Sequence, residues 1–230
     1  MACAFDFHIH SKYSFDSTLE PYKILEIAKR KGLSGIAITD HNTIKGGLEA
    51  KRLNEDKDFS VVVGSEICTE IGDIVGLFLS EEVKSRNSED VIEEIRSQGG
   101  IVVLPHPFKY HRGINKVLKK INLIESFNAR ADKKANLLAH QLAIKNKIPM
   151  IGGSDAHFLS EIGLGKTIFD DFTDAGDVKK NLLCNKRKIE GRYSSKYSEI
   201  ISDAIKSINT DKAYKLVFVP YRLIKAFFGR

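Results

Sequence analysis

Cysteine and long apolar segments are both scarce in this chain of 230 residues. The three cysteines, Cys3, Cys68 and Cys184, are too few and too scattered for a disulfide framework, so we expect a reducing, cytoplasmic location. No apolar run reaches the roughly 18 residues that a membrane span needs. The first ten residues, MACAFDFHIH, lack the basic start and the long apolar stretch of a signal peptide. The sequence therefore argues against a disulfide-rich secreted protein and against a transmembrane protein.

The chain also lacks internal repeats, low-complexity tracts and any strong compositional bias. Hydrophobic residues make up 42% and charged residues 29%, which excludes disorder and collagen-like repeats. A chain of this length can bury one sizeable core, and a closed α/β barrel fits within it.

Positive charge is missing from most of the sequence and is concentrated near its end. The chain has a formal net charge of +6, but residues 186–230 carry 11 Lys and Arg against 4 Asp and Glu, a net of +7. The first 185 residues therefore have a net charge of −1. This distribution argues against a nucleic-acid surface spread over the whole fold.

Short apolar runs alternate with helical patterns over most of the chain. The runs of strand length are 4–9, 35–39, 60–65, 74–79, 101–104, 122–126 and 148–152. Amphipathic spacing predicts helices over 21–31, 88–98 and 131–146. Alternating strands and helices are typical of a parallel sheet covered by helices, and seven strands favour a closed or nearly closed barrel. We therefore predict an α/β fold whose barrel domain spans residues 1–191.

The remaining residues, 192–230, predict a helical extension packed on the barrel. Residues 194–208 have amphipathic spacing, and the last stretch, AYKLVFVPYRLIKAFFGR, is aromatic and basic. Three roles fit this stretch: covering an open edge of the barrel, lying on an anionic membrane surface, or binding the backbone of a nucleic acid. Composition does not separate these alternatives.

Five of the seven histidines lie at or just after the end of a predicted strand. They are His8, His10, His41, His106 and His157. In parallel α/β barrels the carboxyl ends of the strands meet at one face, where active sites are built. The other two are different: His140 falls inside a predicted helix and is expected at its surface, whereas His111 is either a substrate contact or a loop residue.

Carboxylates are expected at the same face, from Asp16, Asp40, Glu66 and Asp155. Alternate residues on a strand share a side, so His8 and His10 can hold one ion. Asp155 and His157, two residues apart in GGSDAH, can do the same from across the barrel. A mixed set of imidazoles and carboxylates suits zinc, manganese or iron and has too much nitrogen for calcium. The five histidines together with Asp16, Glu66 and Asp155 make eight candidate ligands, which is more than one ion needs. We therefore predict two or three divalent ions.

These residues resemble a known family. The segments FHIHSKYSFD, ITDHNTIKGG, GSEI, LPHPF and GGSDAH, in this order over residues 4–157, are similar to the PHP (polymerase and histidinol phosphatase) domain. The resemblance implies a distorted seven-stranded β/α barrel, two or three divalent metals and, for most members, phosphoesterase activity. The family includes histidinol-phosphate phosphatases, small nucleotide-type phosphoesterases with 5′-to-3′ RNA exonucleases among them, and domains of bacterial DNA polymerases. The chain looks most like the small stand-alone phosphoesterases.

Carried over by position, the resemblance implies three metal sites. The first would use His8, His10, Glu66 and Asp155, the second Glu66 and His106, and the third Asp16, His41 and His157. Members often have another histidine in the hairpin after the bridging glutamate, and here the nearest candidate is Asp73. Asp73 is therefore either a replacement ligand or a sign of a weaker second site. Cys68, close in sequence to the bridging Glu66, is expected to be inert.

The chemistry expected at this site is hydrolysis of a phosphate ester by metal-activated water. The sequence contains no G-x-S-x-G nucleophile elbow and no P-loop. Asp40 is expected to assist catalysis by orienting a neighbouring histidine ligand. Arg130 and Asn128 follow a predicted strand and are candidate phosphate-binding residues, and Lys109 is a weaker one.

The predicted function is thus that of a metal-dependent phosphoesterase acting on a phosphomonoester or nucleotide-type substrate. Two alternatives remain: a 5′-to-3′ exonuclease on short RNA or DNA, and a non-catalytic metal-binding module that binds a partner. The sequence specifies neither the substrate nor the oligomeric state.

Overall fold

The computed structural model describes residues 2–170, 178–184, 186–210 and 212–228, and these residues form a mixed nine-stranded sheet. The order of the strands is β7-β6-β5-β4-β3-β2-β1-β8-β9. Their bounds are β1 Cys3–Ile9, β2 Gly35–Ile38, β3 Ser60–Thr69, β4 Gly72–Leu77, β5 Ile101–Leu104, β6 Leu123–Asn128, β7 Met150–Gly153, β8 Gly165–Phe169 and β9 Arg187–Gly191.

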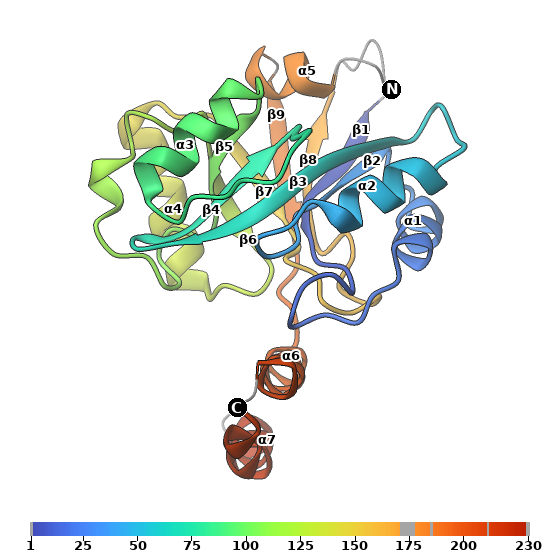
Figure 1. The fold of residues 1–230 in the computed structure, drawn as a ribbon, viewed down its shortest axis with the longest axis vertical. Coiled ribbons are helices and arrows are strands. Elements are labelled where there is room, and N and C mark those ends of the chain that lie inside the picture. Colours follow the sequence, from blue (N-terminus) through green and yellow to red (C-terminus); the bar gives the residue numbers. More distant parts are fainter. Residues whose placement is uncertain (1, 171–177, 185, 211, 229–230) are drawn as a thin grey trace.

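The sheet curls into a nearly closed barrel (Figure 1). β7, at one end of the strand order, lies against β1, β8 and β9 at the other end. β1, β2 and β3 run parallel, as do β5, β6 and β7, whereas β4 pairs antiparallel with both of its neighbours. The predicted α/β barrel is therefore confirmed, and all seven predicted strands are present. β8 and β9 are additional antiparallel strands beside β1.

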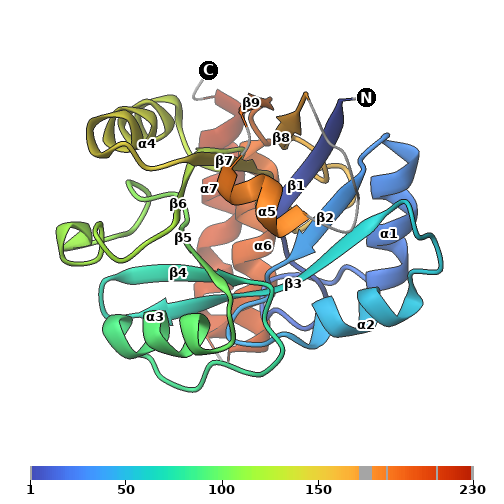
Figure 2. The same ribbon diagram turned by 90° about the horizontal axis from the view of Figure 1, so that it is seen from above.

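Helices cover the outer face of the barrel (Figure 2). They are α1 Pro21–Arg30, α2 Lys45–Leu53, α3 Ser88–Ser97 and α4 Lys133–Asn146, whereas α5 Val178–Cys184 lies over one end of the barrel. Pro21 occupies the first turn of α1, where its missing N–H costs nothing. The Asn87 side chain caps α3 by accepting from the backbone N–H groups of Glu89 and Asp90, and Asp132 caps α4 in the same way.

Apolar side chains fill the barrel and the layers outside it. The interior cluster includes Phe5, Phe7, Val75, Val103 and Phe169, and α5 closes one end of it with Val178 and Leu182. Two further clusters lie outside the sheet, one beneath α1 and α2 and one beneath α3 and α4. Since the interior is packed, the opposite end of the barrel is the part that remains for a site.

The C-terminal extension lies at that opposite end. α6 (Lys196–Asn209) is followed by a 3₁₀ segment, η3 (Ala213–Phe218), and by α7 (Val219–Phe228). α6 lies next to the barrel and α7 lies beyond it (Figure 1). The side chain of Asn209 donates to the carbonyl of Phe15, and the Lys206 ammonium lies over the Phe15 ring. The domain boundary at residue 191 stays a prediction, and residues 171–177 of the predicted barrel domain fall outside the described part.

No helix among the described residues combines the length and the apolar character that crossing a bilayer requires.

Candidate metal centre

All eight predicted ligands lie at one end of the barrel, where the parallel strands finish. They come from the end of β1 and the loop after it, from the loops after β2, β5 and β7, and from β3: His8, His10, Asp16, His41, Glu66, His106, Asp155 and His157. An irregularity in the register between β1 and β2 falls between Asp6 and Ile9. Phe5 and Phe7 belong to the cluster inside the barrel, whereas Ile9 packs in a cluster outside it. The irregularity turns His8 and His10 toward the mouth.

The first group of ligand atoms surrounds the two histidines of β1. Nε2 of His8 and Nε2 of His10 lie 3.1 Å apart. Oε2 of Glu66 is 3.4 Å from the first nitrogen and 3.3 Å from the second. Oδ1 of Asp155 lies 3.3 Å from Nε2 of His10. Two nitrogen lone pairs and two carboxylate oxygens thus converge on one point, which is the arrangement that a divalent ion needs.

The second group shares Glu66 with the first. Its other oxygen, Oε1, lies 2.9 Å from Nε2 of His106, and His8 completes the group. Asp73 is not part of this group among the described residues. His111 packs near His106, but its Nε2 bonds to the backbone carbonyl of Asp73. The predicted replacement of a histidine by Asp73 in the second site therefore stays without geometric support.

Asp73 instead lies beside Cys68 and His41. Cys68 and Asp73 are cross-strand partners in the β3–β4 hairpin, and Sγ of Cys68 is 3.9 Å from Nδ1 of His41. Burial, together with the nearby charge of Asp73, raises the pKa of the Cys68 thiol to about 12. The sulfur is therefore held as a thiol, the poorer form for binding a metal.

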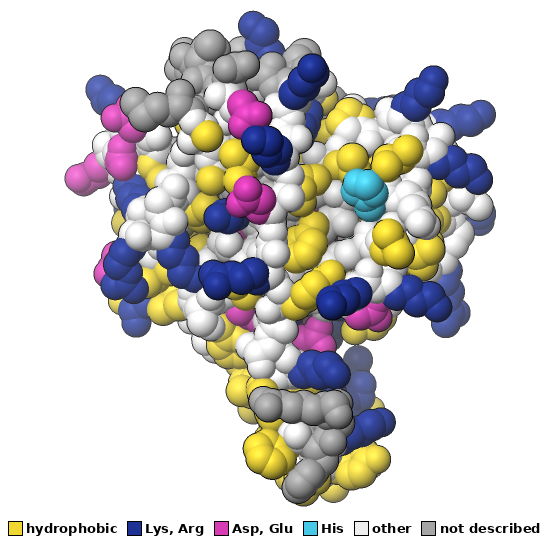
Figure 3. Space-filling view, turned by 180° about the vertical axis from the view of Figure 1, so that it is seen from behind, with side chains coloured by type: hydrophobic (Ala, Val, Ile, Leu, Met, Phe, Trp, Pro, Cys, Tyr) yellow, Lys and Arg dark blue, Asp and Glu magenta, His cyan; other side chains and the backbone are white. Residues whose placement is uncertain are grey.

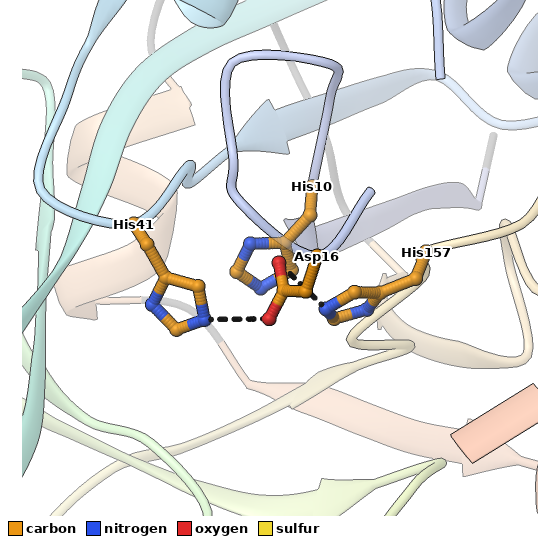
Figure 4. A group of neighbouring side chains, drawn as sticks. All are labelled: His10, Asp16, His41 and His157. Carbon is orange, nitrogen blue, oxygen red and sulfur yellow. Dashed lines mark ion pairs between the residues drawn. The ribbon is translucent and has the colours of Figure 1, made fainter. Parts of the chain in front are cut away.

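The third group consists of Asp16 and the histidines around it (Figure 4). Oδ2 of Asp16 is 3.2 Å from Nε2 of His41, and Oδ1 is 3.3 Å from Nε2 of His157. The Oδ1 atom is buried and makes no hydrogen bond to any described residue. A buried carboxylate oxygen without a donor is costly unless a cation completes it, so this group also fits a metal ion.

The far ring nitrogens of three ligand histidines, His8, His10 and His157, are held by other residues. Nδ1 of His8 donates to Oε1 of Glu125 at 3.0 Å, and Nδ1 of His157 donates to the carbonyl of Asp155 at 2.8 Å. Nδ1 of His10 lies 2.9 Å from the hydroxyl of Ser14. Such contacts hold each ring so that Nε2 faces the ion. The whole donor set therefore fits divalent metals.

Glu125 and Ser14 were missed by the sequence analysis. Glu125 is fully buried and accepts three hydrogen bonds, from His8, from the backbone of His106 and from the amide of Asn128. The only pattern that pointed to it was an acidic residue within an otherwise apolar strand. Ser14 sits in a loop with no distinguishing pattern, and its hydroxyl also accepts from the backbone N–H of His41.

The pKa values of the ligand side chains depend on burial and on the charges of their neighbours. Burial opposes protonation of His10, but hydrogen bonds to Asp155 and Glu66 raise its pKa to about 10. Burial favours the neutral form of Glu66, yet the surrounding histidines hold its pKa well below the usual range. Burial and the charge of His10 lower the pKa of His157 to about 4. Without ions, protons on some imidazoles thus balance the carboxylates.

Two ligands have unusual backbone conformations. The φ of His106 is 25° and that of Asp155 is 54°. Positive φ values cost free energy in residues other than glycine and persist where the surroundings enforce them, often at functional sites. Placing these two side chains at the site therefore costs folding free energy.

Asp40 and Asn128 are buried, and each bonds to neighbours other than those predicted. The carboxylate of Asp40 accepts from the backbone and hydroxyl of Ser11, at 2.5 and 2.7 Å, so it holds the loop after His10 and does not orient a histidine ring directly. The Asn128 amide donates to Glu125 and Asp155, so it positions these carboxylates.

Above the ligands lies a small mouth cavity of about 150 Å³. Its rim contains four cations and two acids from the C-terminal helices and nearby loops, namely Lys109, Arg130, Lys206, Arg222, Glu199 and Asp203. Lys109 is 3.3 Å from Asp155, and despite burial this carboxylate raises the pKa of the lysine. Arg130 donates from one Nη to Ser202 of α6, and its Nε–H has no hydrogen-bond partner among the described residues.

Comparison with known proteins identifies the family. Residues 133–186 match the family described as PHP-associated. Two uncharacterized proteins of Methanocaldococcus jannaschii are similar: one is 48% identical over 114 residues, covering 45% of this chain and 67% of its own length, and the other 34% over 170 residues, covering 69% and 67%. A two-domain protein from Bacteroides vulgatus that contains a predicted PHP-like metal-dependent phosphoesterase shares the fold, with a TM-score of 0.72 at 20% identity. That match covers 84% of this chain and 65% of the other.

The chain belongs to the PHP family.

Another structure with this PHP-like fold is the lesion-specific endonuclease PfuEndoQ from Pyrococcus furiosus. The TM-score is 0.59 at 18% identity, and the match covers 82% of this chain and 58% of the endonuclease. The structural neighbours thus include a protein that contains a predicted PHP-like metal-dependent phosphoesterase and a lesion-specific endonuclease. The clustered imidazoles and carboxylates described above are consistent with metal binding in this member of the PHP family.

Proposed function

We propose that this protein hydrolyses phosphate esters with water activated by two or three divalent ions, manganese, zinc or iron. The main support is the convergence of eight imidazole and carboxylate side chains at one end of a PHP-type barrel, beneath a cavity with a cationic rim. A cytoplasmic location, expected from the few cysteines, is part of the proposal.

The ligand roles follow from the three groups of atoms. One ion would bind His8, His10, Glu66 and Asp155, a second Glu66 and His106, and a third Asp16, His41 and His157. Bound ions of this kind lower the pKa of a water ligand to about 7 and neutralise charge on phosphoryl oxygens. Glu66 can contact two ions because its two oxygens face different histidines.

The rim would bind the phosphate of the substrate. Arg130 lines the cavity, its Nε–H makes no hydrogen bond to any described residue, and a guanidinium matches the spacing of phosphate oxygens. Lys109 is nearly buried between Asp155 and the cavity, where its charge attracts the anionic group and holds Asp155 in its ionised form. Asn128 would act by holding Asp155, and Asp40 by fixing the loop that contains His10.

The test combines metal analysis with a substrate screen. The protein is purified without added metal, its metal content is measured, and phosphomonoesters, nucleoside bisphosphates and short oligonucleotides are assayed with manganese. We expect His10→Ala and Asp155→Ala to reduce hydrolysis to background while the circular dichroism spectrum is retained. His140→Ala, on the exposed face of α4, is the matched control. Full activity in both site variants would refute the proposal.

A second candidate function, trimming of RNA or DNA from the 5′ end, is favoured by a larger hollow next to the mouth. This hollow of about 650 Å³ shares Lys109, Arg130 and Glu199 with the mouth cavity. Its lining includes three aromatic side chains, Phe108, Tyr110 and Tyr193, and two further lysines, Lys133 and Lys196. Aromatic faces stack on bases, and cations bind the backbone of a single strand.

The nuclease alternative makes its own prediction. Phe108→Ala and Tyr193→Ala, at positions that line the larger hollow but not the mouth cavity, should raise KM for a short oligonucleotide several-fold and leave hydrolysis of a small phosphomonoester unchanged. Oligonucleotide cleavage should also weaken with salt, because phosphate contacts release counterions. Equal effects on both substrates would favour the simple phosphoesterase.

A further inference from the structure

The C-terminal end of the described chain presents an apolar face that no other described residue covers. Besides Phe227, the large side chains of η3 and α7 that are 58–77% exposed are Tyr214, Val217, Phe218, Tyr221 and Ile224. Their spacing of three and four residues places them along one side of the helical segment. We call these five residues the apolar stripe.

The stripe belongs to the part of the molecule that protrudes from the barrel. α6 contacts both η3 and α7, and α7 lies on the far side of α6 from the barrel (Figure 1). Apolar side chains are visible on the surface of this protruding part of the molecule (Figure 3). The first role predicted for this segment, covering an edge of the barrel, therefore does not account for the stripe.

The charge around the stripe has a single sign. Residues 212–228 contain Lys212, Lys215, Arg222 and Lys225 and no acidic residue. Arg222 is paired with Asp203 of α6 at 2.7 Å, whereas the three lysines are exposed. The surface thus combines aromatic and aliphatic groups with cations on its flanks.

The combination of apolar groups and cations fits some kinds of partner for the apolar stripe better than others. A second copy docking the same face would set one wholly positive patch against another, since a two-fold interface pairs a patch with itself. A single-stranded nucleic acid would bind the lysines and stack on the aromatic rings, but it would leave the aliphatic Val217 and Ile224 without an apolar partner. The interfacial zone of an anionic bilayer accepts both, because apolar side chains enter the acyl boundary while lysines remain among the headgroups.

We propose that η3 and α7 seat this protein on an anionic lipid surface, with the apolar stripe buried in the interface and Lys212, Lys215 and Lys225 on the headgroups. The proposal is independent of the metal centre, because no residue of the stripe lines the mouth cavity.

Vesicle binding by the full chain tests this proposal. The protein is sedimented with vesicles of phosphatidylcholine alone and of phosphatidylcholine mixed with phosphatidylserine. We expect binding to the anionic vesicles, at least tenfold weaker binding to the neutral ones, and weakening by salt. Ile224→Asp should reduce binding to anionic vesicles at least tenfold. Ile144→Asp is the matched control, because Ile144 of α4 is 59% exposed against 58% for Ile224 and lies outside the stripe.

Three results would overturn the proposal. These are equal binding to both kinds of vesicle or to neither, retained binding in Ile224→Asp, and a dimer in light scattering that Ile224→Asp dissociates. Salt-sensitive binding of RNA without vesicle binding would assign the lysines to nucleic acid. Phosphoesterase activity against a soluble substrate, measured on the same samples, should be equal in all three proteins, which separates this test from that of the catalytic proposal.

Discussion

At the scale of single residues, the candidate site depends on side chains that hold other side chains. Glu125 shows this most clearly, since one oxygen accepts from the ring of His8 and the other from the backbone of His106 and the amide of Asn128. It links two of the proposed ligands and touches no point where an ion would lie.

Glu125→Gln should therefore weaken metal binding without unfolding the protein. The amide group of glutamine would face donors from His106 and Asn128, so one side of the anchor would be lost. We expect metal affinity about 10–100-fold lower, as is usual when the partner of a metal-binding histidine is changed. Isothermal titration with manganese measures this. Glu89→Gln, at an exposed position of α3, should have no effect; an equal loss in both would contradict the assignment.

Protons compete with metal ions at His10. Despite burial, Asp155 and Glu66 raise the pKa of His10 to about 10, so its imidazole is protonated at neutral pH when no ion is bound. A binding ion must displace this proton, and metal affinity should rise with pH by about tenfold per unit for each proton released. Titrations in buffers of different ionisation enthalpy count these protons. Affinity independent of pH between about 6 and 9 would contradict this account.

At the scale of strands and helices, the mouth depends on close contact between β1 and β7. A side-chain carbon on Gly153 would come within 2.5 Å of the Cβ of His8 and would also collide with the Glu125 carboxylate. Only glycine fits where these strands bring the first ligand against its anchor.

Gly153→Ala should therefore displace His8 and lower both metal affinity and stability. An overpacked core position typically costs about 1–3 kcal/mol. Thermal unfolding and manganese titration on the same sample measure the two effects. An unchanged affinity together with a lower melting temperature would show that the strand contact supports the fold but not the site.

The sequence predicted the elements whose patterns are local. The seven apolar runs predicted β1 to β7. The positions of the histidines at the strand ends predicted that these side chains lie together at one end of the barrel. β8 and β9 were missed because their sequences, GKTIF and RKIEG, mix charged and apolar residues in short edge strands. Anchors such as Glu125 and Ser14 were missed because their roles depend on neighbours that are distant in sequence. Asp40 was expected to orient a histidine ring, whereas its bond to Ser11 depends on the geometry of the loop after His10.

At the scale of the whole molecule, the barrel and the C-terminal extension differ in net charge and in surroundings. The barrel body is nearly neutral in sum and buries a group of ionisable side chains at its mouth, whereas the last 45 residues are strongly basic. α6 links these parts, because Glu199, Ser202, Asp203 and Lys206 line the mouth cavity while η3 and α7, which contact α6, carry the apolar stripe. Access to the mouth is therefore shaped by the extension.

Metal ions should also stabilise the whole fold, since a ligand that binds only the folded state raises its stability by mass action. We expect a chelator to lower the melting temperature by several degrees and manganese to restore it. Asp155→Ala should remove most of this response, and a response equal to that of the unchanged protein would place the stabilising ions elsewhere.

The most direct measurement is anomalous diffraction from crystals grown with manganese. The account predicts two or three strong anomalous peaks in the mouth, each about 2.0–2.3 Å from ligand atoms of the groups around His8, Glu66 and Asp16. Manganese bound only outside the mouth, or no peak near these side chains at saturating manganese, would contradict it.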